Sequence, residues 1–344
     1  MTARLSVVMP TYNGAAFIGE ALASVYGQTL PPSEIIIVDD CSRDETPALV
    51  ATLARSAPVP IRLIALVENC GGPARPLNQA IAAASGEFIA VLDQDDVFTP
   101  TKLEDQVGWL ARDRKLSFVF SGCGRYDRPG EAVAGQDVLQ VLQTGGVPAA
   151  AGRCLPGADV FRLLLRHGNF IIGYPGMVFR REDWQRKGGL DERLSIASDY
   201  EFFCWLCLQG GVGFMDRVHY LRRFHATNLC NRVEATRIEG YRIQADYLAR
   251  ESWVLEDAPL AAKLRENIFD LAYLLRQGGH YREALRYYLL SLRAWGWETR
   301  TIMAMVKLLP HWMRRKILAC RGTTPLTPLS LYSGSGVGGE GLSR

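Results

Sequence analysis

The first hundred residues alternate short apolar runs with segments whose apolar residues recur at helical spacing. Four runs have the length of buried strands: Leu5–Met9, Ile35–Val38, Ile61–Val67 and Phe88–Leu92. The segments between them predict three helices: Ala15–Gly27, Asp44–Leu53 and Pro76–Ala84. Unbroken apolar strands separated by helices are typical of a parallel sheet covered on both faces. Right-handed crossovers bring the carboxyl ends of such strands to one edge, where these sheets bind ligands.

The regular alternation ends after the fourth run. The spacing next predicts helices over Thr99–Leu110 and Asp199–Gln209, strands over Leu116–Ser121 and Val212–Phe224, and two short strands within Asn169–Arg180. Residues 124–157 are rich in Gly, Ala and Pro, which predicts a loop. From residue 233 the pattern predicts helices alone: Val233–Leu255, Leu260–Gln277, Tyr281–Trp295 and Thr301–Cys320.

These patterns predict three parts. Residues 1–232 form an α/β domain with a mostly parallel central sheet, and residues 233–321 form a helical C-terminal region. Residues 322–344 carry many Gly and Ser and few large apolar side chains, which predicts a disordered tail.

Composition and charge narrow the class of protein. A hydrophobic fraction of 48% and a charged fraction of 22% are ordinary for a soluble globular protein. A net charge of +3 gives no strong field that would attract nucleic acid. The eight cysteines are scattered, and neither an export signal nor an apolar run of about 20 residues is apparent, so we expect reduced thiols in the cytoplasm.

Polar residues follow each of the four early strands. After the first come Pro10, Thr11 and Tyr12, whose ring and small polar groups suit a nucleobase, although a turn that caps the next helix is the favoured interpretation of these residues taken alone. Asp39 and Asp40 follow the second strand. Two acids at the end of a buried strand are costly unless they contact a polar ligand, such as a base or a ribose hydroxyl. We therefore favour a binding role for this pair.

The third cluster extends from Glu68 to Asn78. It contains Asn69, two adjacent glycines that permit close backbone approach, and Arg75, which is able to contact phosphate. A flexible loop with a solvated arginine is an equally good interpretation of these residues.

The fourth cluster, residues 93–96, places three acids in four positions. Asp93 and Asp95 would face one side of an extended chain and share a ligand. Mg²⁺ or Mn²⁺ prefers such oxygen ligands and would bridge them to a diphosphate, whose charge the metal neutralises as it leaves. An exposed acidic turn is the weaker alternative, because a buried strand leads into the cluster.

Three segments, taken together, resemble family 2 glycosyltransferases of the GT-A fold: Ser6–Asn13, Ile37–Thr46 and Gly86–Asp96. Their order and spacing make the resemblance specific, and it covers residues 5–232. It implies a Rossmann-like domain, a nucleotide-sugar donor with UDP-sugar favoured, inversion at the anomeric carbon, and a saccharide or lipid-linked acceptor. The biological setting that it implies is the synthesis of a cell-surface polysaccharide or glycolipid.

The resemblance and the clusters together give the candidate site residues. The candidate substrate contacts are Pro10, Thr11, Tyr12, Asp39, Asp40, Asn69, Arg75, Asn78, Asp93 and Arg223, and the candidate metal ligands are Asp93, Asp95 and His225. The third cluster departs from the family pattern, which often shows Ala-Arg-Asn where this chain has Pro76-Leu77-Asn78. Arg75 is then a phosphate contact displaced by two residues.

The second half of the domain must supply a base, because inverting transfer needs a carboxylate that takes the acceptor's proton. Within the family's acceptor half, an acid at a helix start has this role, and Asp199 matches that position. Ser198 stands where the family commonly has Glu. A simple helix cap is the structural alternative for Asp199, and Glu201 is the second candidate base.

The helical end suggests partners. Residues 279–288 resemble a fragment of a tetratricopeptide repeat, but such arrays need about three units, so a helical bundle is the better prediction. Residues 311–318 combine basic and apolar side chains, which suits peripheral contact with an anionic membrane surface at the inner face.

Three rival functions fit part of the pattern. A transferase that acts on a polyprenyl phosphate needs no base, since its acceptor is already an anion. A nucleotidyltransferase would show a Gly-rich basic loop after the first strand, which residues 10–14 lack. A degenerate relative that only binds carbohydrate or nucleotide need not keep a metal site and a base together.

Overall fold

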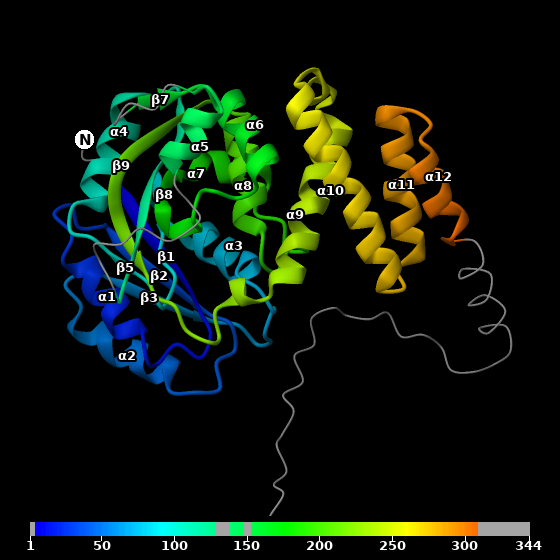
Figure 1. Cartoon of the computed structure of the whole chain (residues 1–344). Coiled ribbons are helices and arrows are strands. Elements are labelled where there is room, and N and C mark those ends of the chain that lie inside the picture. Colours follow the sequence, from blue (N-terminus) through cyan, green and yellow to red (C-terminus); the bar gives the residue numbers. More distant parts are fainter. Residues whose placement is uncertain (1–3, 128–137, 148–152, 309–344) are drawn as a thin grey trace, which may run out of the picture. The chain divides into compact units, whose positions relative to one another are not determined.

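The structure is a computed structural model that describes residues 4–127, 138–147 and 153–308 (Figure 1). The chain divides into two compact units, Met1–Leu271 and Ala272–Arg344. The predicted boundary at residue 232 lies inside the first unit and stays a prediction. The predicted tail lies outside the described residues.

A nine-stranded sheet forms the centre of the first unit, with eight strands in the order β3-β2-β1-β4-β8-β6-β9-β5 and β7 paired to β9. Its strands are β1 Leu5–Thr11, β2 Glu34–Asp39, β3 Ile61–Ala65, β4 Phe88–Val91, β5 Val97–Phe98, β6 Leu116–Arg125, β7 Arg153–Leu155, β8 Met177–Arg180 and β9 Gly211–Arg222. The four early strands pair in parallel, as the apolar runs predict, so their carboxyl ends share one edge.

The other half of the sheet is mixed. Strand β8 is antiparallel to both β4 and β6, whereas β6 and β9 are parallel. Of the two strands predicted within Asn169–Arg180, only β8 forms, and a 3₁₀ turn at Tyr174–Gly176 precedes it. Proline at the second position of this turn lacks the N–H that a central strand would need, which explains the wrong prediction.

Helices cover both faces of the sheet, as Figure 1 shows. On one face, α1 (Ile18–Tyr26) packs against side chains at alternate positions of β1 and β2, α2 (Thr46–Ser56) packs against β3, and α4 (Lys102–Arg112) packs against β6 and β8. On the other face, α3 (Ala74–Ala83) covers β1 and β2. Alternation along each strand supplies apolar side chains to both layers, which is why the early runs are unbroken.

The prediction of a loop over residues 124–157 was wrong in part. The described residues of this stretch include α5 (Val138–Thr144) and strand β7, and α6 (Gly157–His167) begins at its end. Leu142 and Leu155 are buried, so isolated apolar residues anchor elements that their Gly-rich surroundings conceal.

The second half of the unit adds helices beside the sheet. They are α7 (Arg181–Lys187), α8 (Ser198–Cys207), α9 (Val233–Arg250), a 3₁₀ segment at Ser252–Glu256 and the first part of α10 (Ala258–Gln277). Cys204 and Cys207 are buried and free in α8, in agreement with a packing role. Phe202 and Phe203 of α8 pack against Phe179 and Phe118 of the sheet.

The second unit comprises the end of α10, α11 (Tyr281–Trp295) and α12 (Thr299–Val306) in its described part. It is helical, as predicted, although the predicted helix over Thr301–Cys320 is described only to residue 308. None of the helices in the described ranges combines the length and the apolar character needed to cross a membrane.

Candidate active site

The loops that follow β1 and β4 are joined by one side chain at the carboxyl edge of the sheet. Gln94 accepts hydrogen bonds from Thr11 Oγ1 at 2.6 Å and from the Tyr12 amide at 2.9 Å, and it donates to the Tyr12 carbonyl at 3.0 Å. A side chain at Gly14 would place its Cβ 2.1 Å from Gln94 Oε1 and would displace Gln94 from these hydrogen bonds. Tyr12 itself is 40% exposed, which leaves its ring open to a planar ligand.

The acidic pair after β2 lies in a tight turn. Asp39 accepts hydrogen bonds from the Ser42 amide at 2.9 Å and the Ser42 hydroxyl at 2.5 Å. Asp40 accepts two from the Cys70 amide, at 2.9 and 3.0 Å, and one from Asn69 Nδ2 at 3.1 Å. Burial raises the pKa of Asp40, although the hydrogen bonds from Cys70 oppose this shift. Asn69 therefore contacts Asp40, as a site that both residues share would require.

Two other residues of the third cluster lie in different surroundings. Arg75 pairs with Glu68 at 3.0 Å, and both side chains are largely exposed. Asn78 accepts hydrogen bonds from Trp184 Nε1 and the Leu190 amide and donates to the Leu190 carbonyl and Glu192, all within 3.0 Å. Its amide thus joins α3 to the α7 region, and a substrate role for either residue stays a prediction.

The acids after β4 lie close together and partly buried. Burial raises the pKa of Asp93, and the neighbouring Asp95 charge raises it further, while Arg222 opposes both effects. Burial, together with the charges of Asp93 and Asp95, also holds the pKa of Asp96 well above its usual range. Asp96 nevertheless has a structural partner, because it accepts a hydrogen bond from the Arg223 amide at 3.0 Å. Such crowding of carboxyls is costly without a cation.

His225 lies directly against this cluster. Its Nε2 is 2.7 Å from Asp95 Oδ2, its Nδ1 is 2.8 Å from Thr227 Oγ1, and its ring stacks on Phe17 with centroids 4.9 Å apart. Asn228 donates a further hydrogen bond to Asp95 at 3.3 Å. The predicted metal ligands Asp95 and His225 are therefore in contact, and the stacked ring holds the imidazole in place.

The donor set of this cluster meets part of the needs of a divalent cation. Among the residues that the structure describes, no three His, Cys, Asp or Glu side chains converge as a metal-binding group. One carboxylate and one imidazole in contact still suit Mn²⁺, and Mg²⁺ is commonly held by one or two carboxylates together with substrate phosphates. The pair Asp95–His225 fits an ion that a diphosphate helps to bind.

Two adjacent arginines at the end of β9 differ in their surroundings. Arg223 pairs with Glu20 and lies over the rings of Tyr126 and Phe17, with its guanidinium carbon 3.7 and 5.2 Å from their centroids. Arg222, the last residue of β9, has its guanidinium carbon 5.6 Å from the centroid of the Phe224 ring. Burial lowers the pKa of Arg222, but nearby acidic groups, Asp96 and Asp93 among them, raise it overall. Arg223 is thus engaged by Glu20 and two aromatic rings, and its role as a phosphate contact stays a prediction.

Asp199 is the second residue of α8. It accepts hydrogen bonds from the Tyr200 amide at 2.7 Å and from Asn169 Nδ2 at 3.1 Å. Burial raises the pKa of Asp199 to about 6, and these hydrogen bonds limit the shift. Glu201, the second candidate base, forms a partly buried ion pair with Lys187 at 2.9 Å. Asp199 is therefore the carboxyl that is better prepared to take a proton near neutral pH.

Sequence reasoning missed three residues of this site: Gln94, Arg222 and Asn169. Gln94 is the residue between the acids of the fourth cluster, and only the structure shows that it joins two loops. Asn169 lies 30 residues before Asp199, and no local pattern connects them.

Comparisons with known proteins identify the family. The sequence profile of "Glycosyl transferase family 2" matches residues 6–158. The "Succinoglycan biosynthesis protein ExoO" of Rhizobium meliloti (strain 1021) is 43% identical, and the alignment covers 71% of this chain and 75% of ExoO. The chain belongs to glycosyl transferase family 2. A glycosyltransferase is therefore the class of enzyme to which the site belongs.

Other proteins share a shorter segment or the fold with this chain. The "Poly(ribitol-phosphate) beta-N-acetylglucosaminyltransferase TarS" of Staphylococcus aureus (strain Mu50 / ATCC 700699) is 35% identical over 31% of this chain and 19% of TarS. The structure of S. aureus TarS 1-349 in complex with UDP-GlcNAc has a TM-score of 0.57 at 18% identity, over 93% of this chain and 92% of that one. The mannosyltransferase PcManGT from Pyrobaculum calidifontis, in complex with GDP-Man and Mn²⁺, has a TM-score of 0.52 at 21% identity, over 92% and 85%. These likenesses support the GT-A fold.

Proposed function

We propose that the chain is an inverting, metal-dependent glycosyltransferase that moves a sugar from a UDP-sugar to an acceptor hydroxyl in polysaccharide synthesis. One observation carries the proposal. The acidic turn Asp39–Asp40 and the acid–imidazole pair Asp95–His225 follow parallel strands of one sheet, and Asp199, whose pKa is raised to about 6, is near enough to Asp93 for its charge to raise the pKa of Asp93. A site that binds a nucleotide, a diphosphate and a nucleophile would require these groups.

The donor contacts follow from the hydrogen-bonding capacity of the first two turns. The Asp39 and Asp40 carboxylates accept hydrogen bonds from a nucleobase or a ribose, and Asn69 holds Asp40 in orientation. The exposed Tyr12 ring stacks on the base, while Thr11, fixed by Gln94, sets the position of that loop. UDP is favoured because the TarS structure, which shares the fold, contains UDP-GlcNAc.

Mg²⁺ or Mn²⁺ would lie at Asp95 and His225, with Asp93 beside them. When bound, the metal supplies a positive charge for the departing diphosphate. The protein contributes orientation: Asn228 and Thr227 fix the two ligands, and Phe17 limits rotation of the His225 ring.

Asp199 acts as the base for the acceptor. With a pKa of about 6 it is mostly ionised at neutral pH and still basic enough to accept the hydroxyl proton as the new glycosidic bond forms. Asn169 and the Tyr200 amide hold the carboxylate so that one face remains free for the acceptor. The polyprenyl-phosphate alternative would leave this base without a role.

A screen of nucleotides tests the proposal. Calorimetry of the full chain with Mn²⁺ should show UDP binding at micromolar affinity, at least about tenfold tighter than binding of GDP or dTDP, and UDP-sugars should be hydrolysed slowly. EDTA should weaken UDP binding. A chain that binds none of these nucleotides with Mn²⁺ or Mg²⁺ would leave only the degenerate binding relative as an interpretation.

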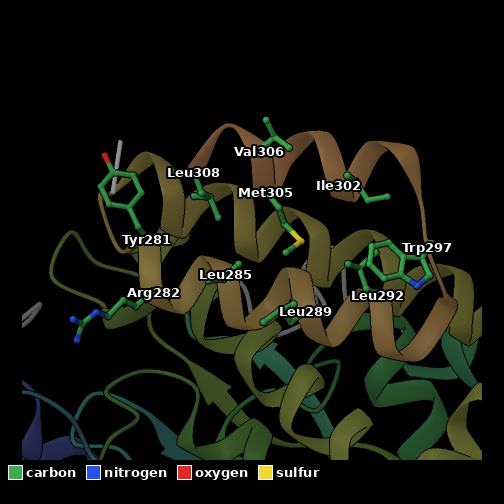
Figure 2. A pocket seen from close by; sticks show the side chains of 10 residues that line it. All are labelled: Tyr281, Arg282, Leu285, Leu289, Leu292, Trp297, Ile302, Met305, Val306 and Leu308. Atoms are coloured by element: carbon green, nitrogen blue, oxygen red, sulfur yellow. The ribbon is translucent and has the colours of Figure 1, made fainter. Parts of the chain in front are cut away.

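We propose further that the second unit contacts an anionic membrane surface. Residues 272–344 carry eleven Lys and Arg against three Asp and Glu, whereas the rest of the chain is net acidic. Between α11 and α12 lies an apolar groove of about 270 Å³, lined by Leu285, Leu289, Leu292, Trp297, Ile302 and Met305, among others (Figure 2). Trp297 is 85% exposed, and an exposed aromatic ring at an apolar groove suits a lipid headgroup region.

Sedimentation with lipid vesicles tests this contact. We expect the full chain to bind phosphatidylcholine vesicles that contain phosphatidylglycerol, and to bind pure phosphatidylcholine at least about fivefold less, because each basic residue adds about 1 kcal/mol near an anionic surface. Trp297→Ser should reduce binding several-fold, whereas Val67→Ser, at an equally exposed position of the first unit, should not. Equal binding of both vesicle types, or a groove covered in a dimer, would contradict the proposal.

A further inference from the structure

A buried carboxylate on α9 holds the segment that leads into the candidate base. Glu239 is 2% exposed and accepts four hydrogen bonds from three consecutive residues. Its Oε1 accepts from the Ser195 amide at 3.0 Å and the Ser195 hydroxyl at 2.9 Å, and its Oε2 accepts from the Ile196 amide at 3.0 Å and the Ala197 amide at 2.8 Å. Both oxygens are therefore used for one short stretch of backbone.

This stretch has no strand or helix of its own to fix it. Residues 195–197 lie between α7 and α8, and Ala197 is the residue from which α8 starts. Asp199 follows Ala197 by two residues. The direction in which the Asp199 side chain projects from the start of α8 therefore depends on how this backbone is held. Buried amides need acceptors, and Glu239 supplies them from a helix that is distant in sequence.

The same stretch touches the loop that holds Asp40. A Cβ at Gly72 would lie 2.6 Å from the Ser195 carbonyl oxygen and 2.7 Å from its Cα, so the two backbones are in direct contact. Gly72 follows Asn69 and Cys70, the residues that hydrogen-bond Asp40. The segment 195–197 is consequently held between the Asp40 loop on one side and Glu239 on the other.

An ionised carboxylate is costly to bury, and four charge-assisted hydrogen bonds offset that cost only when their geometry is kept. A packing role alone would be served by an apolar side chain. Here a buried acid uses both of its carboxylate oxygens to bind the segment before Asp199. This indicates that the position of that segment matters.

We propose that Glu239 is a positioning residue for sugar transfer: by holding residues 195–197 against the Gly72 loop, it sets the place of Asp199 relative to the bound donor. The proposal rests on the proposed function, because it gives Asp199 the role of base. It assigns Glu239 no contact with substrate.

Glu239→Gln tests the proposal. One oxygen becomes an amide donor that faces backbone N–H groups, so the segment is released on that side. With UDP-GlcNAc and Mn²⁺ as the probe, we expect kcat for hydrolysis to fall about 10- to 100-fold, since displacement of a catalytic group by about 1 Å has effects of this size. The affinity for UDP should stay within about threefold, because Asp39 and Asp40 are untouched.

Matched variants distinguish the loss of positioning from a general loss of stability. Glu234→Gln changes an exposed acid of the same helix and should leave kcat as in the wild type. Glu239→Asp keeps the charge and should recover part of kcat. Gly72→Ala displaces Ser195 from the opposite side and should lower kcat as well, whereas Gly240→Ala meets nothing within 4 Å and should not.

Hydrogen exchange supplies a readout that does not depend on turnover. The amides of Ser195, Ile196 and Ala197 should exchange faster in Glu239→Gln and remain protected in Asp199→Asn. If the wild-type chain fails to bind UDP, the proposed function is lost. If it binds and turns over donor while Glu239→Gln has wild-type kcat, only the role of Glu239 is lost.

Discussion

Asp199→Asn is expected to lower the turnover number of sugar transfer by a factor of about 10²–10⁴, because it removes the group that accepts the acceptor's proton while keeping the shape of the side chain. The wild-type rate should fall on the acid side as Asp199 is protonated, with a midpoint near its pKa of about 6. Rates measured across pH 5–8 with a UDP-sugar and an acceptor would show both effects.

The same substitution should stabilise the fold at neutral pH. Burial raises the pKa of Asp199 from 3.8 to about 6. Between these two values the unfolded chain releases the proton first, so the wild-type free energy of unfolding decreases as pH rises. The penalty is complete above about pH 7 and amounts to at most about 3 kcal/mol. The amide of the Asp199→Asn variant carries no charge and escapes this penalty. In thermal melts, the melting temperature of the variant should therefore rise relative to that of the wild type from pH 4 to pH 7.

Two outcomes would redirect the interpretation. An unchanged rate in Asp199→Asn would favour an anionic acceptor such as a polyprenyl phosphate. If Glu201→Gln abolished transfer and Asp199→Asn did not, the base would be Glu201, despite its ion pair with Lys187.

Asp95→Ala is expected to remove the metal dependence of nucleotide binding. The variant loses the carboxylate that contacts His225 Nε2 at 2.7 Å and so leaves the imidazole without its partner in the cluster. We expect wild-type UDP affinity to rise at least about 100-fold on addition of Mn²⁺, a difference of about 2.7 kcal/mol, and the variant to bind UDP weakly with or without the ion.

Isothermal titration with Mn²⁺, Mg²⁺ and EDTA measures this difference. Asp216→Asn removes an exposed acid of β9 and controls for the change in net charge. An Asp95→Ala protein that kept the Mn²⁺-dependent gain would place the ion elsewhere and remove Asp95 and His225 from the metal site.

The early part of the fold follows from local pattern, and the later part does not. Strands β1, β2 and β4 are buried on both faces, so their apolar runs are unbroken and bounded by turns. Strand β9 was predicted because it is long, but β5 has only two residues and gains its place by pairing with β9. Short elements such as α5 and β7 are held by tertiary contacts that no local window contains.

The residues of the site likewise divide into those that a local sequence pattern predicts and those that it does not. The acids after β2 and β4 were predicted because charges at the ends of buried strands are conspicuous. The different partners of Arg223 and Arg222 were not, since Glu20 and the acid cluster both lie far from these residues in the sequence. Glu239 acts on residues about 40 positions earlier and carries no sequence signal.

The bridge formed by Gln94 has a thermodynamic consequence. The turn at Thr11 and Tyr12 and the turn that carries Asp95 are parts of one hydrogen-bonded network, so a ligand that orders one of them favours order in the other. Nucleotide and cation would then bind with positive cooperativity beyond their direct attraction. By linkage, the factor by which the ion tightens the nucleotide must equal the factor by which the nucleotide tightens the ion.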